Sequence, residues 1–97
     1  MPRQRPPKAL WRELRVEIWE RDGRRCRHCG VVVSLQECHI DHVHSGKTAG
    51  NGRGNLRTLC RRCHVLRADP RHRGMTARSI ERGVIPPDWR SLVWRDY

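Results

Sequence analysis

Between residues 39 and 64 the chain reads His39-Ile40-Asp41-His42, then Asn55, then Cys60-Arg61-Arg62-Cys63-His64. A second pair of cysteines, Cys26-x-x-Cys29, lies upstream. The two C-x-x-C pairs together supply the four thiolates that a tetrahedral structural zinc takes. A zinc closed by four sulfurs does no chemistry and leaves the acidic, amide and imidazole side chains of this segment without a role. This surplus of polar groups points to catalysis.

The composition predicts one small domain that needs a metal to fold. The chain has 97 residues with no Phe and one Tyr, so it buries a modest core, and metal binding adds directly to the free energy of folding. Four of the five cysteines stand in C-x-x-C pairs, the total is odd, and the sequence shows no secretory signal, which together favour metal ligands over disulfides. We therefore expect a cytoplasmic protein, in the host cell cytoplasm if it is phage-encoded. The fifth cysteine, Cys38, is expected to be a small buried residue.

The charge balance predicts a polyanionic partner. The chain has 21 Lys and Arg against 10 Asp and Glu, which gives a formal net charge of +11. Such cations release counterions from a phosphate backbone, and the guanidinium fork of arginine matches phosphate. No apolar run approaches the roughly 18 residues that span a membrane, and no basic amphipathic helix offers a membrane face. Nucleic acid is therefore favoured over a membrane surface or a simple gain in solubility.

The apolar spacing predicts a small α+β unit. We expect helices over 9–20, 55–70, 76–82 and 87–94, and strands over 31–33 and 37–43. The two strands would form a hairpin, and a loop with four glycines would connect it to the helix that starts at Asn55. Zinc would then tie the mouth of the hairpin to the start of that helix. In the first helix, Trp11 and Trp19 are expected to be core residues rather than platforms for bases.

The same order of residues predicts a cation site between the second strand and the following helix. His64 can face Asp41 across this junction, and one carboxylate oxygen plus one imidazole makes an open site for a catalytic divalent cation. His42 is the candidate general base, because neutral imidazole can deprotonate water near pH 7. A regular strand points Asp41 and His42 to opposite faces, so one site for both requires the strand to end or kink there. Simpler interpretations are a hydrogen-bonded surface histidine for His42 and a helix N-cap for Asn55.

The ordered motifs resemble the HNH endonuclease family, in its small phage and bacterial type. The resemblance rests on residues 39–43 and 55–64 and on Arg21-Asp22-Gly23 ahead of Cys26, and it covers roughly residues 11–69. It implies an α+β fold, a zinc-stabilised ββα-metal (His-Me finger) domain with flanking N- and C-terminal helices. It also implies hydrolysis of DNA phosphodiesters to 3′-hydroxyl and 5′-phosphate ends. In that chemistry Asp41 and His64 would bind the cation, His42 would activate water, and Asn55 would orient His42 or brace the loop.

Cofactors, partners and organisation follow from these interpretations. The expected cofactors are a structural Zn²⁺ on Cys26, Cys29, Cys60 and Cys63 and a catalytic Mg²⁺ or Mn²⁺, with Ni²⁺, Co²⁺ or Zn²⁺ also accepted by a histidine ligand. The cations expected to contact nucleic acid are Lys47, Arg53, Arg57, Arg61, Arg62 and Arg67. A basic arm would occupy 1–8, the nuclease core 9–69 and a helical extension 70–97. One site cuts one strand, so a monomer or weak dimer would nick DNA, and phage packaging proteins (terminase) are the partners that the resemblance suggests.

Two other functions compete with a metal-dependent nuclease. A non-catalytic, zinc-stabilised nucleic-acid-binding module would explain the charge and the cysteines, but it would leave Asp41, His42 and His64 without a function. A zinc scaffold for a protein partner would show weak salt dependence in its main interaction, which the net charge of +11 disfavours. The nuclease is the hypothesis that uses all of these residues.

Overall fold

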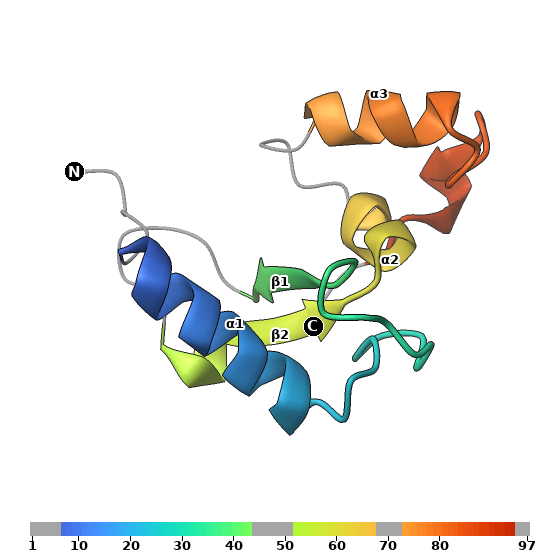
Figure 1. The fold of residues 1–97 in the computed structure, drawn as a ribbon. Coiled ribbons are helices and arrows are strands. Elements are labelled where there is room, and N and C mark those ends of the chain that lie inside the picture. Colours follow the sequence, from blue (N-terminus) through green and yellow to red (C-terminus); the bar gives the residue numbers. More distant parts are fainter. Residues whose placement is uncertain (1–6, 44–51, 68–72, 95–97) are drawn as a thin grey trace.

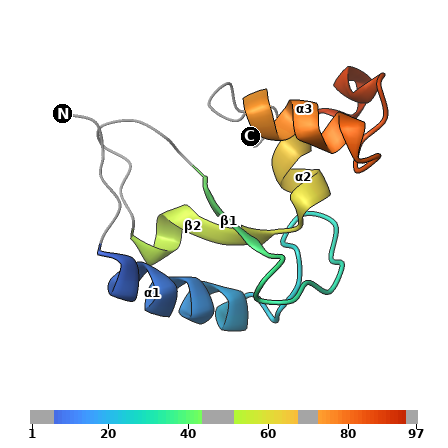
Figure 2. The ribbon, with the colours of Figure 1, turned by 45° about the horizontal axis from the view of Figure 1, so that its top comes forward.

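The sheet has two strands with helices on both of its sides. The structure is a computed structural model that describes residues 7–43, 52–67 and 73–94. Its elements, in chain order, are α1 (Lys8–Arg21), β1 (His39–His42), η1 (Arg53–Asn55), β2 (Leu56–Leu59), α2 (Arg61–Leu66), α3 (Arg73–Glu81) and η3 (Trp89–Leu92). Helix α1 runs beneath the sheet, while α2 and α3 lie on its other side (Figures 1 and 2). The predicted α+β class with flanking helices is confirmed.

The register of the sheet sets which side chains share a face. β1 and β2 are antiparallel, with His39 opposite Leu59, Asp41 opposite Arg57 and His42 opposite Leu56. Because side chains alternate along a strand, His39 and Asp41 share one face with Arg57, and His42 lies on the other face with Leu56. Asp41, Leu56 and Leu59 are buried. The strand pair therefore has one face toward α1 and one toward α2.

The predicted hairpin and the predicted start of the second helix are wrong. Residues 31–33 make only an isolated bridge, between Arg25 and Val32, and the strand that pairs with β1 is 56–59 instead. Helix α2 begins at Arg61 rather than at residue 55. The cause is the first C-x-x-C turn (residues 26–29), which folds residues 31–33 back on 24–26 through hydrogen bonds from Cys26 N to Val31 O and from Val33 N to Arg24 O. The backbone of residues 31–33 is thus used locally and is not available to β1.

Helix α1 confirms the prediction for 9–20 and is fixed to the rest of the fold at its C-terminal end. Ile18 is fully buried, and the Trp19 indole donates to the carbonyl of Val33 at 2.9 Å. The chain leaves the helix through Gly23 at φ +71°, in the left-handed region that glycine adopts without a steric penalty. Trp19 is thus bonded to the body of the fold but is only half-buried, so it lies at the edge of the core rather than in it.

Asp22 joins the end of α1 to the middle of β2. Its side chain is fully buried and accepts hydrogen bonds from the backbone N–H of Thr58 at 2.8 Å and from the Arg21 guanidinium at 2.8 Å. Arg21 also donates to the carbonyls of Leu56 and Arg53, at 2.7 and 2.8 Å. Burial alone would raise the pKa of Asp22, but the Arg21 guanidinium and the Thr58 amide outweigh it and lower the pKa. The carboxylate is therefore ionised in the folded protein.

Replacing Asp22 with Asn is expected to destabilise the fold by about 1–3 kcal/mol, because the neutral amide cannot serve all of these donors. Urea unfolding of the zinc-loaded protein at neutral pH measures this loss. Glu20→Gln is the matched control, since Glu20 pairs with Arg24 at the exposed surface and its loss should cost no more than about 0.5 kcal/mol. Equal effects of the two substitutions would contradict the assigned role of Asp22.

The C-terminal region packs on α2. Val65, Leu66 and Ile85 form a buried cluster, with Trp89 and Trp94 against it. The helical pieces predicted over 76–82 and 87–94 correspond to α3 and to the shorter η3. Trp89 packs against this cluster, whereas Leu92 is 40 % exposed. Among residues 7–43, 52–67 and 73–94, no helix is both long and apolar enough to cross a membrane.

Candidate functional site

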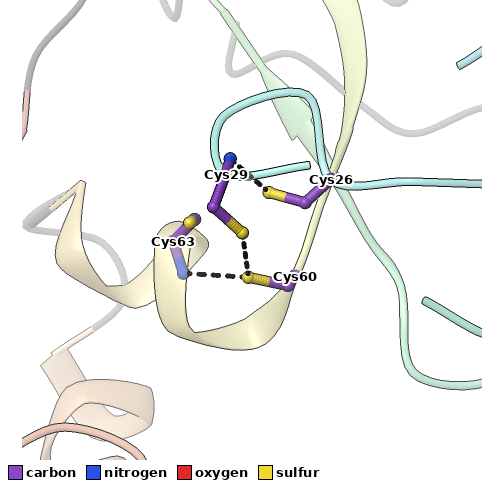
Figure 3. A group of neighbouring side chains, drawn as sticks. All are labelled: Cys26, Cys29, Cys60 and Cys63. Carbon is purple, nitrogen blue, oxygen red and sulfur yellow. Dashed lines mark hydrogen bonds between the residues drawn. The ribbon is translucent and has the colours of Figure 1, made fainter. Parts of the chain in front are cut away.

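The two C-x-x-C turns bring four sulfur atoms together. Figure 3 shows the four-cysteine cluster, which consists of Cys26, Cys29, Cys60 and Cys63. All four Sγ atoms lie within 4.8 Å of one another, and those of Cys29 and Cys60 are 3.8 Å apart. A tetrahedral zinc with Zn–S bonds of roughly 2.3 Å separates its sulfurs by roughly 3.8 Å. The cluster is therefore compatible with a structural zinc site, as predicted.

Backbone hydrogen bonds shape each C-x-x-C turn around its first sulfur. The N–H of Cys29 points at the Sγ of Cys26 at 3.5 Å, and the N–H of Cys63 at the Sγ of Cys60 at 3.4 Å. In the first turn, Gly30 at φ +83° closes the loop by donating to the carbonyl of Cys26 at 2.9 Å. In the second turn, Cys60 is also the N-cap of α2. The same geometry thus ends β2, starts α2 and aims the sulfurs at one point.

The electrostatics of the cluster call for a cation at its centre. Burial opposes ionisation of Cys26, but N–H groups of the two turns outweigh it and lower the pKa of this thiol to about 7. Burial and the neighbouring sulfurs raise the pKa of Cys60 and of Cys63. Thiolates this close repel one another, and a bound divalent cation removes the repulsion. The donor set therefore fits zinc chemically as well as geometrically.

Trp94 covers the cluster from the C-terminal side. Its ring stacks on His28 with ring centroids 3.9 Å apart, and His28 Nδ1 lies 3.4 Å from the Sγ of Cys63. The Trp94 indole donates to the carbonyl of Cys63 at 2.8 Å. Contacts of this kind around a metal centre exclude water and orient the ligands. Sequence reasoning missed both residues.

A second polar cluster surrounds Asp41, on the face of the sheet toward α2. Asp41 is 4 % exposed. Arg57, opposite it on β2, donates to Oδ2 at 2.9 Å, and Arg67, just after α2, donates to Oδ1 at 2.9 Å. His64 Nε2 lies 3.5 Å from Oδ1. The fold thus brings Asp41 and His64 together, as the sequence predicted.

The other predicted catalytic residues lie elsewhere around the sheet. His42 faces α1, with its ring nearly parallel to that of Trp11 (8°) and the centroids 6.2 Å apart. Asn55 ends η1, and its carbonyl accepts a hydrogen bond from Val43 N at 2.9 Å, next to His42. The strand alternation that separates Asp41 from His42 is therefore present, and β1 ends at His42. Asn55 is not a helix N-cap, because a strand follows it.

A family model described as HNH endonuclease matches residues 26–69. Residues 26–69 form a domain of the HNH family. The matched segment includes both C-x-x-C turns, β1, β2, α2 and Arg67 just after α2, so it holds every residue of the four-cysteine cluster and of the cluster around Asp41.

Two curated relatives are similar to this chain. Over 77 residues, 77% of this chain and 20% of the relative, the chain is 35% identical to Zorya protein ZorE of Escherichia coli. Over 53 residues, 53% of this chain and 5% of the relative, it is 34% identical to the CRISPR-associated endonuclease Cas9 of Actinomyces naeslundii. The chain thus spans a fifth or less of the length of these relatives. The search of solved structures gave no significant match.

The arginines predicted to contact nucleic acid have several different environments in the HNH domain. Arg57 and Arg67 pair with Asp41, and Arg53 pairs with Glu17 on α1. Arg62 is exposed, and Arg61 is half-buried. Lys47 lies outside the described residues, as does most of the glycine loop. Half of the predicted cations are thus engaged with carboxylates of the same chain.

His39 is a residue of the second cluster whose role sequence reasoning left open. Its Nδ1 lies 2.9 Å from Nδ1 of His64. The signal was present in the sequence, because residues two apart on a strand share a face and Asp41 was already assigned to the site. The contact leaves Nε2 of His64 as the ring nitrogen that faces Asp41.

Proposed function

We propose that the HNH domain is a metal-dependent endonuclease that hydrolyses phosphodiester bonds of DNA. The single observation that carries the proposal is the approach of His64 Nε2 to Asp41 Oδ1 at 3.5 Å, in a domain of the HNH family. Two ligands at right angles on a six-coordinate ion with bonds of 2.0–2.1 Å lie roughly 3 Å apart. The carboxylate and imidazole pair therefore fits one divalent cation, Mg²⁺ or Mn²⁺, with other positions left for water and phosphate.

In this proposal the residues near Asp41 each have a distinct task. When bound, the cation polarises the scissile phosphate and stabilises the leaving oxygen. Arg67 holds the end of β1 in place, because it donates to the carbonyls of His42 and Val43 as well as to Asp41. The four-cysteine cluster, with zinc bound, fixes the start of α2 and so positions His64 next to Cys63.

We assign His42 as the general base that takes a proton from the attacking water. It is the last residue of β1, and the backbone bends at the next residue, Val43. Trp11 restrains its ring, and the carbonyl of Asn55 ties the next residue, Val43, to the start of β2. A single site of this kind cuts one strand, so we expect nicking by a monomer and double-strand cleavage only with a second protomer.

One observation favours the second candidate, a non-catalytic nucleic-acid-binding module. Both carboxylate oxygens of Asp41 accept hydrogen bonds from arginines, and His42 faces α1 rather than Asp41. In such a module Asp41 would be a structural anion that holds β2 and α2 together. The two candidates differ in what a divalent cation does.

The experiment is a supercoiled-plasmid assay on zinc-loaded protein, with Mg²⁺ or Mn²⁺ added. We expect cation-dependent nicking that Asp41→Asn lowers at least about a hundredfold, because loss of the cation forfeits several kcal/mol of transition-state stabilisation. Glu37→Gln is the control, since Glu37 is an exposed carboxylate bonded to Ser34. Tight, salt-sensitive DNA binding without nicking by any of the three proteins would establish the binding module instead.

A further inference from the structure

A cavity lined by arginines lies next to Asp41 and has no role in the site described so far. It has a volume of about 500 Å³, and its lining residues are Arg21, Arg27, Val43, Gly54, Leu56 and Arg57. This volume is in the range of roughly 300–1,000 Å³ that encloses small ligands. Three of the six lining residues are arginines, and none is acidic. The lining therefore contains three guanidinium donors and no carboxylate of its own.

Arg21 and Arg57 are fixed parts of the cavity wall. Arg21 donates to the Asp22 carboxylate and to the carbonyl of Leu56. Arg57 is bonded to Asp41 and lies over the Trp94 ring, 5.0 Å from its centroid. These contacts hold both guanidiniums in place without a ligand, so their charge is preorganised at the cavity.

Arg27 is the donor that the fold leaves to be used by a ligand. Its backbone N–H is anchored to the carbonyl of Thr58 at 2.9 Å, at the outer edge of β2. Its side chain is 59% exposed and approaches a carboxylate of the described chain only at Asp22, at 3.7 Å. That carboxylate already accepts from Arg21 and from Thr58 N. A separation of 3.7 Å is too long for a hydrogen bond, so Arg27 makes none with Asp22. The N–H groups of its guanidinium can therefore donate to a ligand.

The rest of the wall, which consists of Val43, Gly54 and Leu56, carries no charge. Val43 and Leu56 supply apolar surface, and a Cβ built on Gly54 would meet no atom within 4 Å. A planar guanidinium can bind two phosphate oxygens at once. Because no carboxylate lines this cavity, none competes with a phosphate there for the N–H groups that face it. Because Arg57 contacts both Asp41 and the cavity, a phosphate bound here is next to the cation site rather than in it.

We propose that this cavity binds one non-scissile backbone phosphate of the nucleic-acid strand, with Arg27 as its principal donor. This inference rests on the proposed function, because the ligand is the nucleic acid that the nuclease would cut. The formal net charge of +11 favours a polyanion over a free phosphate group as the source. Held in this cavity, the phosphate sets the register of the strand against Asp41 and His64.

The test measures binding of a fluorescent DNA duplex by anisotropy, without Mg²⁺ or Mn²⁺, between about 50 and 200 mM NaCl. We expect Arg27→Ala to weaken binding about tenfold at the low-salt end and to reduce the log–log salt slope by about 0.9, the value of one phosphate contact. Arg27→Lys, which keeps the charge and loses the fork, should restore the slope but only part of the affinity. Arg82→Ala removes the same charge from the exposed surface just after α3 and should leave the slope unchanged.

Each other outcome overturns the proposal in a recognisable way. Equal losses for Arg27→Ala and Arg82→Ala would show a diffuse field and no subsite. Unchanged binding by Arg27→Ala would remove the residue from the interface. Calorimetry with inorganic phosphate provides the second arm: saturable binding that needs Arg27, without an effect of Arg27 on the duplex, would make this a free-phosphate site. Since no cleavage is measured, a protein that binds through Arg27 but never nicks would disprove the nuclease and leave the subsite standing.

Discussion

Replacing Cys60 with Ser, or stripping zinc with a strong chelator, is expected to unfold the region from the first C-x-x-C turn to the end of α2. The apparent binding free energy of a structural zinc is about 10–16 kcal/mol, which is similar in size to the roughly 5–15 kcal/mol of net stability of a typical domain. The buried core here is small, with Leu59 packed directly against Cys26 and Cys63. Loss of the metal therefore removes most of the free energy of folding. Circular dichroism and the dispersion of a proton NMR spectrum measure the result.

Cys38→Ser is the matched control for this experiment. Cys38 is 4 % exposed and lies outside the four-cysteine cluster, with its Sγ against the carbonyl of Leu35 at 3.3 Å. A serine hydroxyl can donate to the same carbonyl. We expect this variant to keep one zinc per chain by elemental analysis and to keep a folded spectrum. A folded, dispersed spectrum for the chelated protein would show that the cysteines are not needed as metal ligands.

The second large effect is expected for His42→Ala, which should lower the rate of plasmid nicking by about 10²–10⁴. The loss should appear in the cleavage step alone, because strand alternation places His42 on the opposite face of β1 from Asp41. Binding of Mn²⁺, followed by electron paramagnetic resonance, should therefore match that of the unsubstituted protein. Asp41→Asn should show the opposite pattern and lose Mn²⁺ binding.

Added imidazole separates a base from a structural side chain at this position. If His42 takes a proton from water, imidazole in solution should recover part of the nicking by His42→Ala. A ring that merely stacks on Trp11 would give no such recovery, although the variant would be less stable. Nicking by His42→Ala at the unsubstituted rate would remove His42 from the chemistry and return the assignment of the base to the remaining polar residues.

The parts of this molecule that the sequence predicts are those fixed by local spacing. The C-x-x-C pairs predict the four-cysteine cluster, because one tetrahedral zinc takes four thiolate ligands and each pair supplies two of them. The stripe of Trp11, Leu14 and Ile18 predicts α1. The position of His64 directly after Cys63 predicts its approach to Asp41, since the end of β2 and the start of α2 are joined by the same turn.

The parts that the sequence does not predict depend on contacts between distant residues. Leu56 and Leu59 are spaced by three, which suits a helix, but in a four-residue strand both are buried as well, so their periodicity does not decide between the two. Pairing with β1 decides it, because residues 31–33 are held by the first C-x-x-C turn. The arginine pairs on Asp41 and the contact of His39 with His64 are likewise set by the register of the sheet.

The four-cysteine cluster also has a consequence for how such a module is inherited. The Sγ atoms of its first and last cysteines, Cys26 and Cys63, lie within 4.8 Å of each other. The segment between these cysteines therefore begins and ends at the same place in the fold. A segment with adjoining ends can be inserted into a host loop at little cost in loop-closure entropy, since the cost grows only slowly with inserted length. The relatives match this chain over only 20% and 5% of their own lengths. A segment whose two ends meet at one metal site is well suited to insertion into a larger chain.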